Sequence, residues 1–269
     1  MSVDFWSIFA LYLLLGSVVG VTAGLLGIGG GLLVVPALLW LLPLAGIDSS
    51  IAMQMALGTS LATIIFTSSS SALNHLRLGN VEVGLIKSLA PGVVVGGFIG
   101  SYLTELIPTQ YLPKVFGIIV LLLALQMLLA LKFTATRTMP SPIKATASGG
   151  IMGVVSSLAG IGGGSLTVPY LSFYGIEMRK AIGTSSLCGT LIALAGMTGF
   201  VIHGVNVENL PPMSLGYVYL PALCGISITS ILTTRIGAKL ASHLPTSTLK
   251  KIFADFSIYS AGKCSWIRR

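Results

Sequence analysis

GLLGIGGGLLVVP, residues 24–36, places glycines at positions 24, 27, 29, 30 and 31 inside an otherwise unbroken apolar run. Glycine is a poor helix former, because ordering its backbone costs more entropy than ordering that of any other residue. A second stretch, GIGGGSLTVPYL at residues 160–171, repeats the pattern. The repetition indicates that each glycine run breaks an apolar segment at a defined point.

The composition is typical of a membrane protein. Hydrophobic residues make up 54% and charged residues 8% of the chain, whereas a soluble domain carries about a quarter charged residues. Several apolar stretches reach about 20 residues, the length that crosses the hydrocarbon core of a bilayer. Alternating strand patterns are too few for an outer-membrane barrel. We therefore expect an all-α, polytopic helical membrane protein.

The net charge of +8 indicates cytoplasmic loops rather than nucleic-acid binding, because Lys and Arg collect in the cytoplasmic loops of membrane proteins. The first apolar segment begins near Phe5 with no Lys or Arg before it and no small-residue cleavage pattern after it. We expect this segment to be retained rather than removed as a signal peptide. The three cysteines lack CxxC spacing, which argues against a disulfide or metal framework.

Apolar segments follow one another along the chain, separated by polar loops. One longer polar connection, KFTATRTMPSPIK at residues 132–144, carries three cations and two prolines and is the expected linker between two halves. We predict apolar segments at about residues 5–26, 31–46, 52–73, 84–104 and 112–131 before the linker, and at about 145–159, 165–175, 182–202 and 214–234 after it, with a last candidate after 248.

Three blocks of the first half recur in the second half in the same order. Besides the glycine runs, MALGTSLAT (55–63) corresponds to KAIGTSSLC (180–188), and GSYLTELIPTQYLPKVFG (100–117) corresponds to GAKLASHLPTSTLKKIFA (237–254). Many transporters are built from two such repeats, with the substrate site between them. We expect a first transmembrane repeat at residues 1–131, a cytoplasmic linker at 132–144 and a second transmembrane repeat at 145–269.

The distribution of cations predicts how the repeats are oriented. If each glycine run is the tip of a helical hairpin, each half contains five apolar segments, and Lys114 is the single cation of the even-numbered loops. This split satisfies the positive-inside rule and predicts an N-terminus outside. Because five is an odd number, the two halves are inverted relative to each other. The odd-numbered loops hold Arg77, Lys87, Lys132, Arg137, Lys144, Arg179, Lys180, Arg235, Lys239, Lys250 and Lys251.

A re-entrant hairpin, which enters and leaves through the same face of the membrane, gives the same distribution of loops. The segment at 165–175 is short for a full span, and re-entrant backbone is tolerated where protein or water surrounds it. In an inverted pair the hairpins enter from opposite faces. We therefore predict that their glycine tips meet near the middle of the bilayer.

The end of the chain departs from the repeat. PKVFG (113–117) leads into a clean apolar helix, whereas the matching KKIFA (250–254) leads into DFSIYSAGKCSWIRR (255–269), which contains four charged residues and no long apolar run. We expect the last helix of the second repeat to be missing or degenerate from about residue 254.

The glycine tips are the first candidate for a binding site. Backbone N–H groups of glycine can approach a ligand closely, and each tip leads into a helix whose first N–H groups are unpaired and carry a partial positive charge. Such helix ends bind anions in transporters. The alternative is close helix packing, for which small residues are favoured in membranes. The candidate residues are Gly29, Gly30, Gly31, Gly162, Gly163 and Gly164.

A Gly-Thr-Ser motif follows each tip, at residues 58–60 and 183–185. Its hydroxyls can donate to anionic oxygens without a buried cation; alternatively, they bond to carbonyls of their own helices or to neighbouring parts of the protein. A histidine near the end of the segment that follows each motif either couples protons, because histidine titrates near physiological pH, or caps the helix. We interpret the two histidines as a matched pair of the repeat. The candidates are Thr59, Ser60, Thr184 and Ser185 for the anion, and His75 and His203 for coupling.

Other functions find no support in the sequence. The dinucleotide fingerprint needs a glycine where residue 32 is leucine, and a phosphate-binding P-loop needs Gly-Lys-Ser/Thr, which both glycine runs lack. We find no nucleophile–base pair and no cluster of His, Cys, Asp and Glu. We therefore expect no enzymatic activity, no metal site and no cofactor.

The duplicated GIGGGLLVVPAL and GIGGGSLTVPYL, each followed by Gly-Thr-Ser, together with HLRLGNV (75–81) and LPTSTLKKIFA (244–254), resemble the TauE/SafE family up to about Phe253. The resemblance implies a transporter of small anions in a prokaryotic inner membrane. We expect a secondary transporter, an exporter of sulfite, organosulfonates or related sulfur-containing carboxylates. The alternatives are a permease for a metal cation or an organic acid, and a non-transporting membrane subunit of a complex.

The resemblance and the composition also indicate the partners of the chain. These are the small anion, the lipid bilayer and a second copy of the chain in a homodimer, with no nucleic acid. The expected location is the inner (plasma) membrane.

Overall fold

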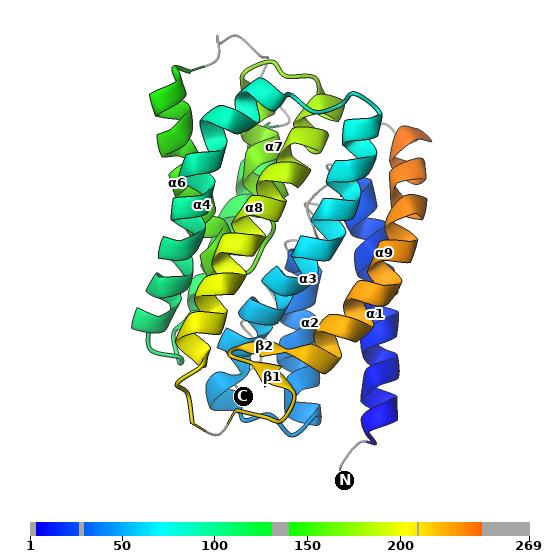
Figure 1. Ribbon diagram of the computed structural model, residues 1–269, viewed down its shortest axis with the longest axis vertical. Helices are drawn as coiled ribbons and strands as arrows, with labels where there is room; N and C mark the ends of the chain where they lie inside the picture. Colours follow the sequence, from blue (N-terminus) through cyan, green and yellow to red (C-terminus); the bar gives the residue numbers. More distant parts are fainter. Residues whose placement is uncertain (1–3, 27–29, 131–139, 209, 244–269) are drawn as a thin grey trace.

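The computed structural model describes residues 4–26, 30–130, 140–208 and 210–243 (Figure 1). In these residues the chain forms nine helices and one short β-hairpin, which confirms the expected helical membrane fold. The elements are α1 (Phe5–Leu26), α2 (Gly31–Leu44), α3 (Ser49–Arg77), α4 (Val83–Leu106), α5 (Leu112–Ala130), α6 (Pro142–Leu158), α7 (Gly164–Phe173), α8 (Met178–Gly204), β1 (Ser214–Leu215), β2 (Val218–Tyr219) and α9 (Leu220–His243).

The helices follow the predicted apolar segments closely, with one exception. The segment predicted at 214–234 begins instead with the hairpin β1–β2, and its helix α9 starts six residues later. The hairpin turns at Gly216, whose φ of +54° suits glycine, and Met213 before it also has a positive φ of 62°. The predicted last segment after 248 lies outside the described residues.

Five of the described helices, α1, α3, α4, α8 and α9, are long and apolar enough to cross a membrane. The helices after the two glycine runs are much shorter, with 14 residues in α2 and 10 in α7. At 1.5 Å per residue they extend about 21 and 15 Å, less than the 30 Å of the hydrocarbon core. Helices α2 and α7 are therefore too short to cross this core by themselves, and the re-entrant form of the hairpins stays a prediction.

The two halves run in opposite directions. Helix α1 rises from the N-terminal end at the bottom of Figure 1, whereas its counterpart α6 descends from the top. The same inversion holds for α3, which rises, and α8, which descends. Among the described residues, every Lys and Arg except Lys114 lies near the upper ends of the helices, as the predicted distribution requires. These cations are Arg77, Lys87, Lys144, Arg179, Lys180, Arg235 and Lys239.

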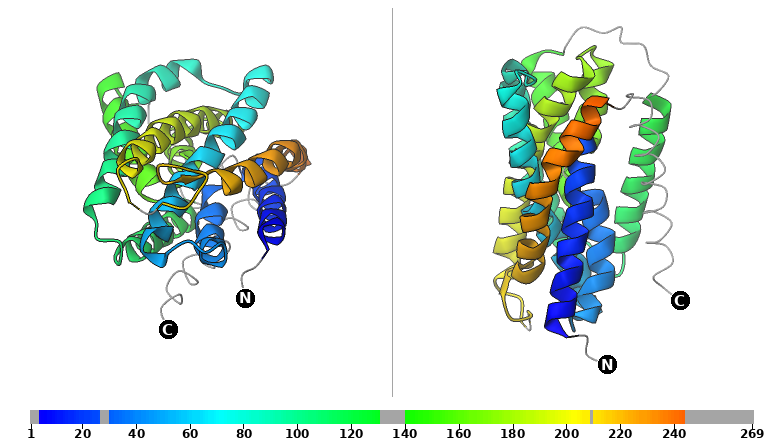
Figure 2. Two further views of the ribbon diagram at one scale, coloured as in Figure 1. Left: turned by 60° about the horizontal axis from the view of Figure 1, so that its bottom comes forward. Right: turned by 90° about the vertical axis from the view of Figure 1, so that its right-hand side faces the viewer.

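The first helix of each half pairs in parallel with the fourth helix of the other half. Helix α1 packs along α9, with Gly16 against Thr229 and Gly20 against Thr233. Helix α6 packs along α4 in the same way (Figure 2). These glycines let the backbones approach closely, which is how membrane helices associate. The corresponding contacts between α4 and α6 are Gly92 against Thr146, Gly96 against Gly150 and Gly100 against Val154.

Helices α3 and α8 form the centre of the bundle and pack antiparallel. Ser71 Oγ lies 3.1 Å from Ser186 Oγ, and Leu61 contacts Gly196 further along both helices. Because α1 and α6 each pair with the other half, the two repeats interlock. The boundaries of the repeats at 131 and 144 stay a prediction.

Candidate functional site

Both glycine tips reach the middle of the bundle. Gly30, the residue before α2, has a φ of +79°, and Gly160, in the second tip, has a φ of +59°, a conformation that favours glycine. Gly160 contacts Leu57 of α3, and Gly163 contacts Ile192 of α8. At the first tip, Gly31 contacts Ile64 of α3. Leu57, Ile64 and Ile192 all lie in the interior of long helices, so the chain turns inside the bundle at both tips.

The two tips touch each other. A Cβ atom on Gly31 would collide with the carbonyl oxygen of Gly160 and would lie 2.9 Å from Cα of Ile161. The start of α2 and the turn before α7 are therefore in direct contact, as the inverted hairpins predicted. Gly29, a candidate of the first tip, lies outside the described residues.

The second tip rests on α3 and α8. Ser60 Oγ donates a hydrogen bond to the carbonyl oxygen of Gly160 over 2.7 Å, and both residues are buried. On the opposite side, a Cβ atom on Gly189 would lie 3.2 Å from the backbone nitrogen of Gly163. Of the candidate glycines, Gly162, Gly163 and Gly164 are all buried at this contact. Ser60 is thus placed at the tip, where its predicted role in anion binding is untested.

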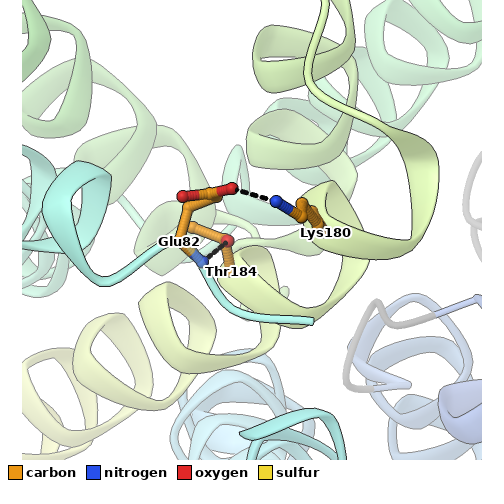
Figure 3. A network of polar contacts seen from close by, with 3 residues as sticks. All are labelled: Glu82, Lys180 and Thr184. Carbon is orange, nitrogen blue, oxygen red and sulfur yellow. Dashed lines mark hydrogen bonds and ion pairs between the residues drawn. The ribbon is translucent and has the colours of Figure 1, made fainter. Parts of the chain in front are cut away.

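The threonine of each Gly-Thr-Ser motif binds the chain of the other half. The backbone N–H of Tyr219 donates to Thr59 Oγ1 over 2.9 Å. In the other half, the backbone N–H of Glu82 donates to Thr184 Oγ1 over 3.0 Å (Figure 3). Tyr219 and Glu82 each precede the fourth helix of their half. Each threonine therefore accepts a bond from a helix start, and its own hydroxyl hydrogen is left to donate elsewhere.

The glycine of each motif lies against the same segment of the other half, the one that precedes its fourth helix. A Cβ atom on Gly58 would lie 3.0 Å from the carbonyl oxygen of Tyr217, and one on Gly183 would collide with the carbonyl oxygen of Asn80. The serines differ, because Ser185 Oγ donates to the carbonyl of Ile182 in its own helix over 2.8 Å. The motif thus has a structural role, as the alternative to anion binding predicted.

An ion pair lies beside the bond between Glu82 and Thr184. Lys180 Nζ lies 2.6 Å from Glu82 Oε1, and both side chains are more than a third exposed (Figure 3). Lys180 is in the first turn of α8, where a cation is opposed by the helix dipole. The carboxylate of Glu82 compensates for this position.

At the opposite end of the bundle, the β-hairpin makes the corresponding contact, because Tyr219, which bonds to Thr59, lies in β2. Tyr217 and Tyr219 are buried there, although they lie outside the membrane-spanning helices. Burial raises the pKa of the Tyr217 phenol to about 12, and the nearby carboxylate of Glu105 acts in the same direction. The Tyr217 hydroxyl is therefore a hydrogen-bond donor at physiological pH.

The two candidate histidines lie at opposite ends of the bundle and are not equivalent. His75 contacts Gly183, and the residue that contacts Gly58 in the same way is Phe200. The interpretation of His75 and His203 as a matched pair is therefore wrong, because the repeat places Phe200 where His75 stands. His203 Nδ1 instead lies 2.7 Å from the carbonyl oxygen of Gly199. A role of either histidine in proton coupling stays a prediction.

Three buried serines at the second tip were not among the sequence candidates. Ser156, Ser157 and Ser165 have no hydrogen-bond partner for their hydroxyls among the residues that the structure describes. The sequence held a signal for them, because the first half has no serine at any of the matching positions. In the part of the chain that the structure describes, no group of three His, Cys, Asp or Glu side chains is placed to hold a metal ion.

Comparison with known proteins places this arrangement among membrane transporters. The family model described as sulfite exporter TauE/SafE matches residues 12–264. A probable membrane transporter protein of Haemophilus influenzae is 42% identical over 252 residues, which are 93% of this chain and 96% of the relative. The probable membrane transporter protein YunE of Bacillus subtilis is 32% identical over 220 residues, 74% of this chain and 79% of the relative.

A more distant relative also aligns along its whole length. A probable membrane transporter protein of Methanocaldococcus jannaschii is 26% identical over 254 residues, which are 92% of this chain and 91% of the relative. No solved structure matches the chain.

Proposed function

The chain belongs to the sulfite exporter TauE/SafE family and is a multi-pass membrane transporter, and on this premise we propose that it carries small anions by secondary transport. The substrates are sulfite, organosulfonates or related sulfur-containing carboxylates, and the direction is export. The protein lies in the inner (plasma) membrane, with its N-terminus outside and the linker at 132–144 in the cytoplasm.

The observation that carries this proposal is the contact between the two glycine tips. Gly31 begins α2 and Gly164 begins α7, so two helix N-termini point into one region at mid-bundle. The first N–H groups of a helix bind anions through hydrogen bonds and the helix dipole. Discontinuous helices that meet at the midplane are the usual site of secondary transporters.

The neighbouring side chains suit an anion. The hydroxyl of Ser60 binds the second tip through the carbonyl of Gly160, and that of Ser68 lies beside it. A hydroxyl such as that of Ser68 can donate to an anionic oxygen without placing a cation in the membrane. No acidic residue occurs between Asp48 and Glu82 or between Glu177 and Glu208, so α3 and α8 carry no carboxylate at membrane depth. A cation carrier with a carboxylate site would need one there.

Alternating access follows from the paired helices. The α1–α9 pair and the α4–α6 pair are each closely packed, so each moves as a unit against the central helices. The bonds of Thr59 to Tyr219 and of Thr184 to Glu82 close the two ends of the bundle. One of these two bonds breaks while the other stays formed, and the anion leaves through the end of the bundle that has opened.

The proposal is tested by a flux panel. The purified full chain is reconstituted in liposomes and assayed for uptake of sulfite, methanesulfonate, taurine, acetate and Mn²⁺. We expect uptake of one or more of the sulfur-containing anions above that of protein-free liposomes. Uptake of Mn²⁺ or acetate alone would favour the metal-cation or organic-acid permease, and no uptake of any solute would favour the non-transporting subunit.

A further inference from the structure

The two hairpin tips differ in polarity although they are equivalent in the repeat. The second hairpin carries hydroxyl side chains just before and just after its turn, where the first hairpin has apolar residues or glycine. At these matching positions, only the second hairpin therefore brings polar side chains to the region where the tips meet. The pairs of matching positions are Ser156 and Ala23, Ser157 and Gly24, and Ser165 and Leu32.

These serine hydroxyls are buried and unpaired. The exposed fractions of Ser156, Ser157 and Ser165 are 2%, 0% and 1%, and none of the three Oγ atoms has a hydrogen-bond partner in the described part of the chain. Buried serines in helices ordinarily donate to a carbonyl one turn earlier, as Ser186 does to Ile182. A buried hydroxyl without a partner destabilises the fold, so its presence calls for a physical reason.

All three serines lie directly at the turn. The backbone N–H of Gly160 donates to the carbonyl of Ser157 over 3.1 Å, and that of Ile161 donates to the carbonyl of Ser156 over 2.9 Å. Ser165 is the second residue of α7. Its Cα–Cβ bond is tilted toward the N-terminal end of the helix, as all such bonds in α-helices are.

The backbone at the start of α7 also has free donors. Among the described residues, the N–H groups of Gly164 and Ser165 donate no hydrogen bond to a backbone carbonyl or a side chain. Gly163 has no capping side chain to supply one. The orphaned hydroxyl of Ser165 and the free N–H groups therefore occupy the same first turn.

We propose that Ser156, Ser157 and Ser165, with the first N–H groups of α7, bind the head group of the transported anion, so that the second hairpin is the binding half. This inference rests on the proposed function. Residues 145–173 contain no charged side chain, so every donor at this hairpin is neutral.

The number of donors selects the head group. Three hydroxyls and two N–H groups are more donors than the about four acceptor sites of a carboxylate can take, whereas the three oxygen atoms of a sulfonate or of hydrogen sulfite have room for all of them. Neutral donors also favour a singly charged head group over a dianion, because the desolvation cost of an ion rises steeply with its charge. The site therefore prefers a monoanion with three oxygens, an organosulfonate or sulfite in its singly protonated form.

The test measures thermal unfolding of the purified full chain with sodium methanesulfonate and with sodium acetate. We expect methanesulfonate to stabilise the wild type more than acetate does. Ser165→Ala raises the unfolding temperature without anion, because the unpaired hydroxyl is gone, and weakens methanesulfonate affinity roughly tenfold. Ser156→Ala and Ser157→Ala act in the same direction. The matched control is Ser227→Ala, since Ser227 is also buried and unpaired but lies in α9, outside the hairpin.

The outcomes separate this inference from the proposed function. If methanesulfonate stabilises the wild type and all three hairpin variants equally, the serines do not bind the anion and the inference is overturned. It is also overturned if Ser227→Ala weakens affinity as much as Ser165→Ala. If no anion stabilises or crosses with the wild-type protein, the proposed function itself has failed.

Discussion

The hydroxyl oxygen of Thr59 accepts a hydrogen bond from the backbone N–H of Tyr219 over 2.9 Å, across 160 residues of sequence. Thr184 and Glu82 make the equivalent bond in the inverted half. Each bond fixes the start of the fourth helix of one half to the third helix of the other half. The Gly-Thr-Ser motif is therefore a structural link between the repeats, in addition to any role at the transport site.

Removing this link destabilises the protein, more at Thr59 than at Thr184. In Thr59→Val the N–H of Tyr219 is left buried without a partner, which costs about 1–3 kcal/mol. The bond to Thr184 is only partly buried, so water replaces it in Thr184→Val and the loss is smaller. Unfolding of both variants in detergent checks the order.

Thr59→Ser and Thr184→Ser serve as controls, because serine keeps the accepting oxygen. They retain most of the stability. An unchanged unfolding temperature in Thr59→Val, combined with a loss of anion affinity, would show that the hydroxyl acts on the anion instead of the helix start.

Gly31→Ala destabilises the contact between the tips. The added Cβ collides with the carbonyl of Gly160 and lies 2.9 Å from Cα of Ile161, and backbone atoms cannot move aside as a flexible side chain can. Such overpacking costs about 1–3 kcal/mol. Gly117→Ala is the matched control in α5, because nothing lies within 4 Å of its added Cβ, and it raises stability through helix propensity. Equal stability of the two variants would contradict the observed contact.

The ion pair between Glu82 and Lys180 contributes less than the neighbouring bond to Thr184. Both side chains are more than a third exposed, and such pairs are screened by water and salt. We expect Glu82→Gln and Lys180→Gln to lower the unfolding temperature less than Thr184→Val does. The effect disappears in about 1 M salt, where the Debye length is about 3 Å. A larger, salt-independent loss would refute this ranking.

Cysteine labelling tests the predicted orientation. Ser49, the first residue of α3, and Ser141, just before α6, are both exposed and lie at opposite ends of the bundle. In a background without native cysteines, Ser49→Cys reacts with a membrane-impermeant maleimide in intact cells. Ser141→Cys reacts only after the membrane is permeabilised. The reverse pattern would place the cation-rich end outside and invert the topology.

Much of the fold could be predicted from the sequence, because membrane helices are set by local hydrophobicity and by loop charge. The glycine runs predicted the hairpins, and the separation of Lys114 from the other cations predicted that the two halves are inverted. The β-hairpin before α9 was missed, since the conformation of Met213 and Gly216 depends on packing against the end of α8, where Gly216 contacts Val201.

The site was harder to predict than the fold. Sequence reasoning found the glycines of the tips and Ser60, which do lie together at mid-bundle. It could not show that Thr59 and Thr184 accept bonds from helix starts far away in the sequence. It also aligned His75 with His203, although the contacts place Phe200 opposite His75, and extending the aligned Gly-Thr-Ser blocks without a gap gives the same pair. The bonds of the two threonines depend on contacts between halves, which a single sequence does not contain.

The central claim, that an anion binds at the second glycine tip and is carried from there, is tested most directly by anion exchange with Gly163→Ala. The atoms nearest to the added Cβ are the flexible end of Ile192 and, at ordinary contact distance, the backbone of Gly189, so the fold is retained while a methyl group is added beside the first N–H groups of α7. Liposomes loaded with sulfite are assayed for uptake of radiolabelled sulfite. We predict rapid exchange with the wild type and loss of most of it with an equal amount of folded Gly163→Ala. Exchange at the wild-type rate in this variant, or none with the wild type, would contradict the account.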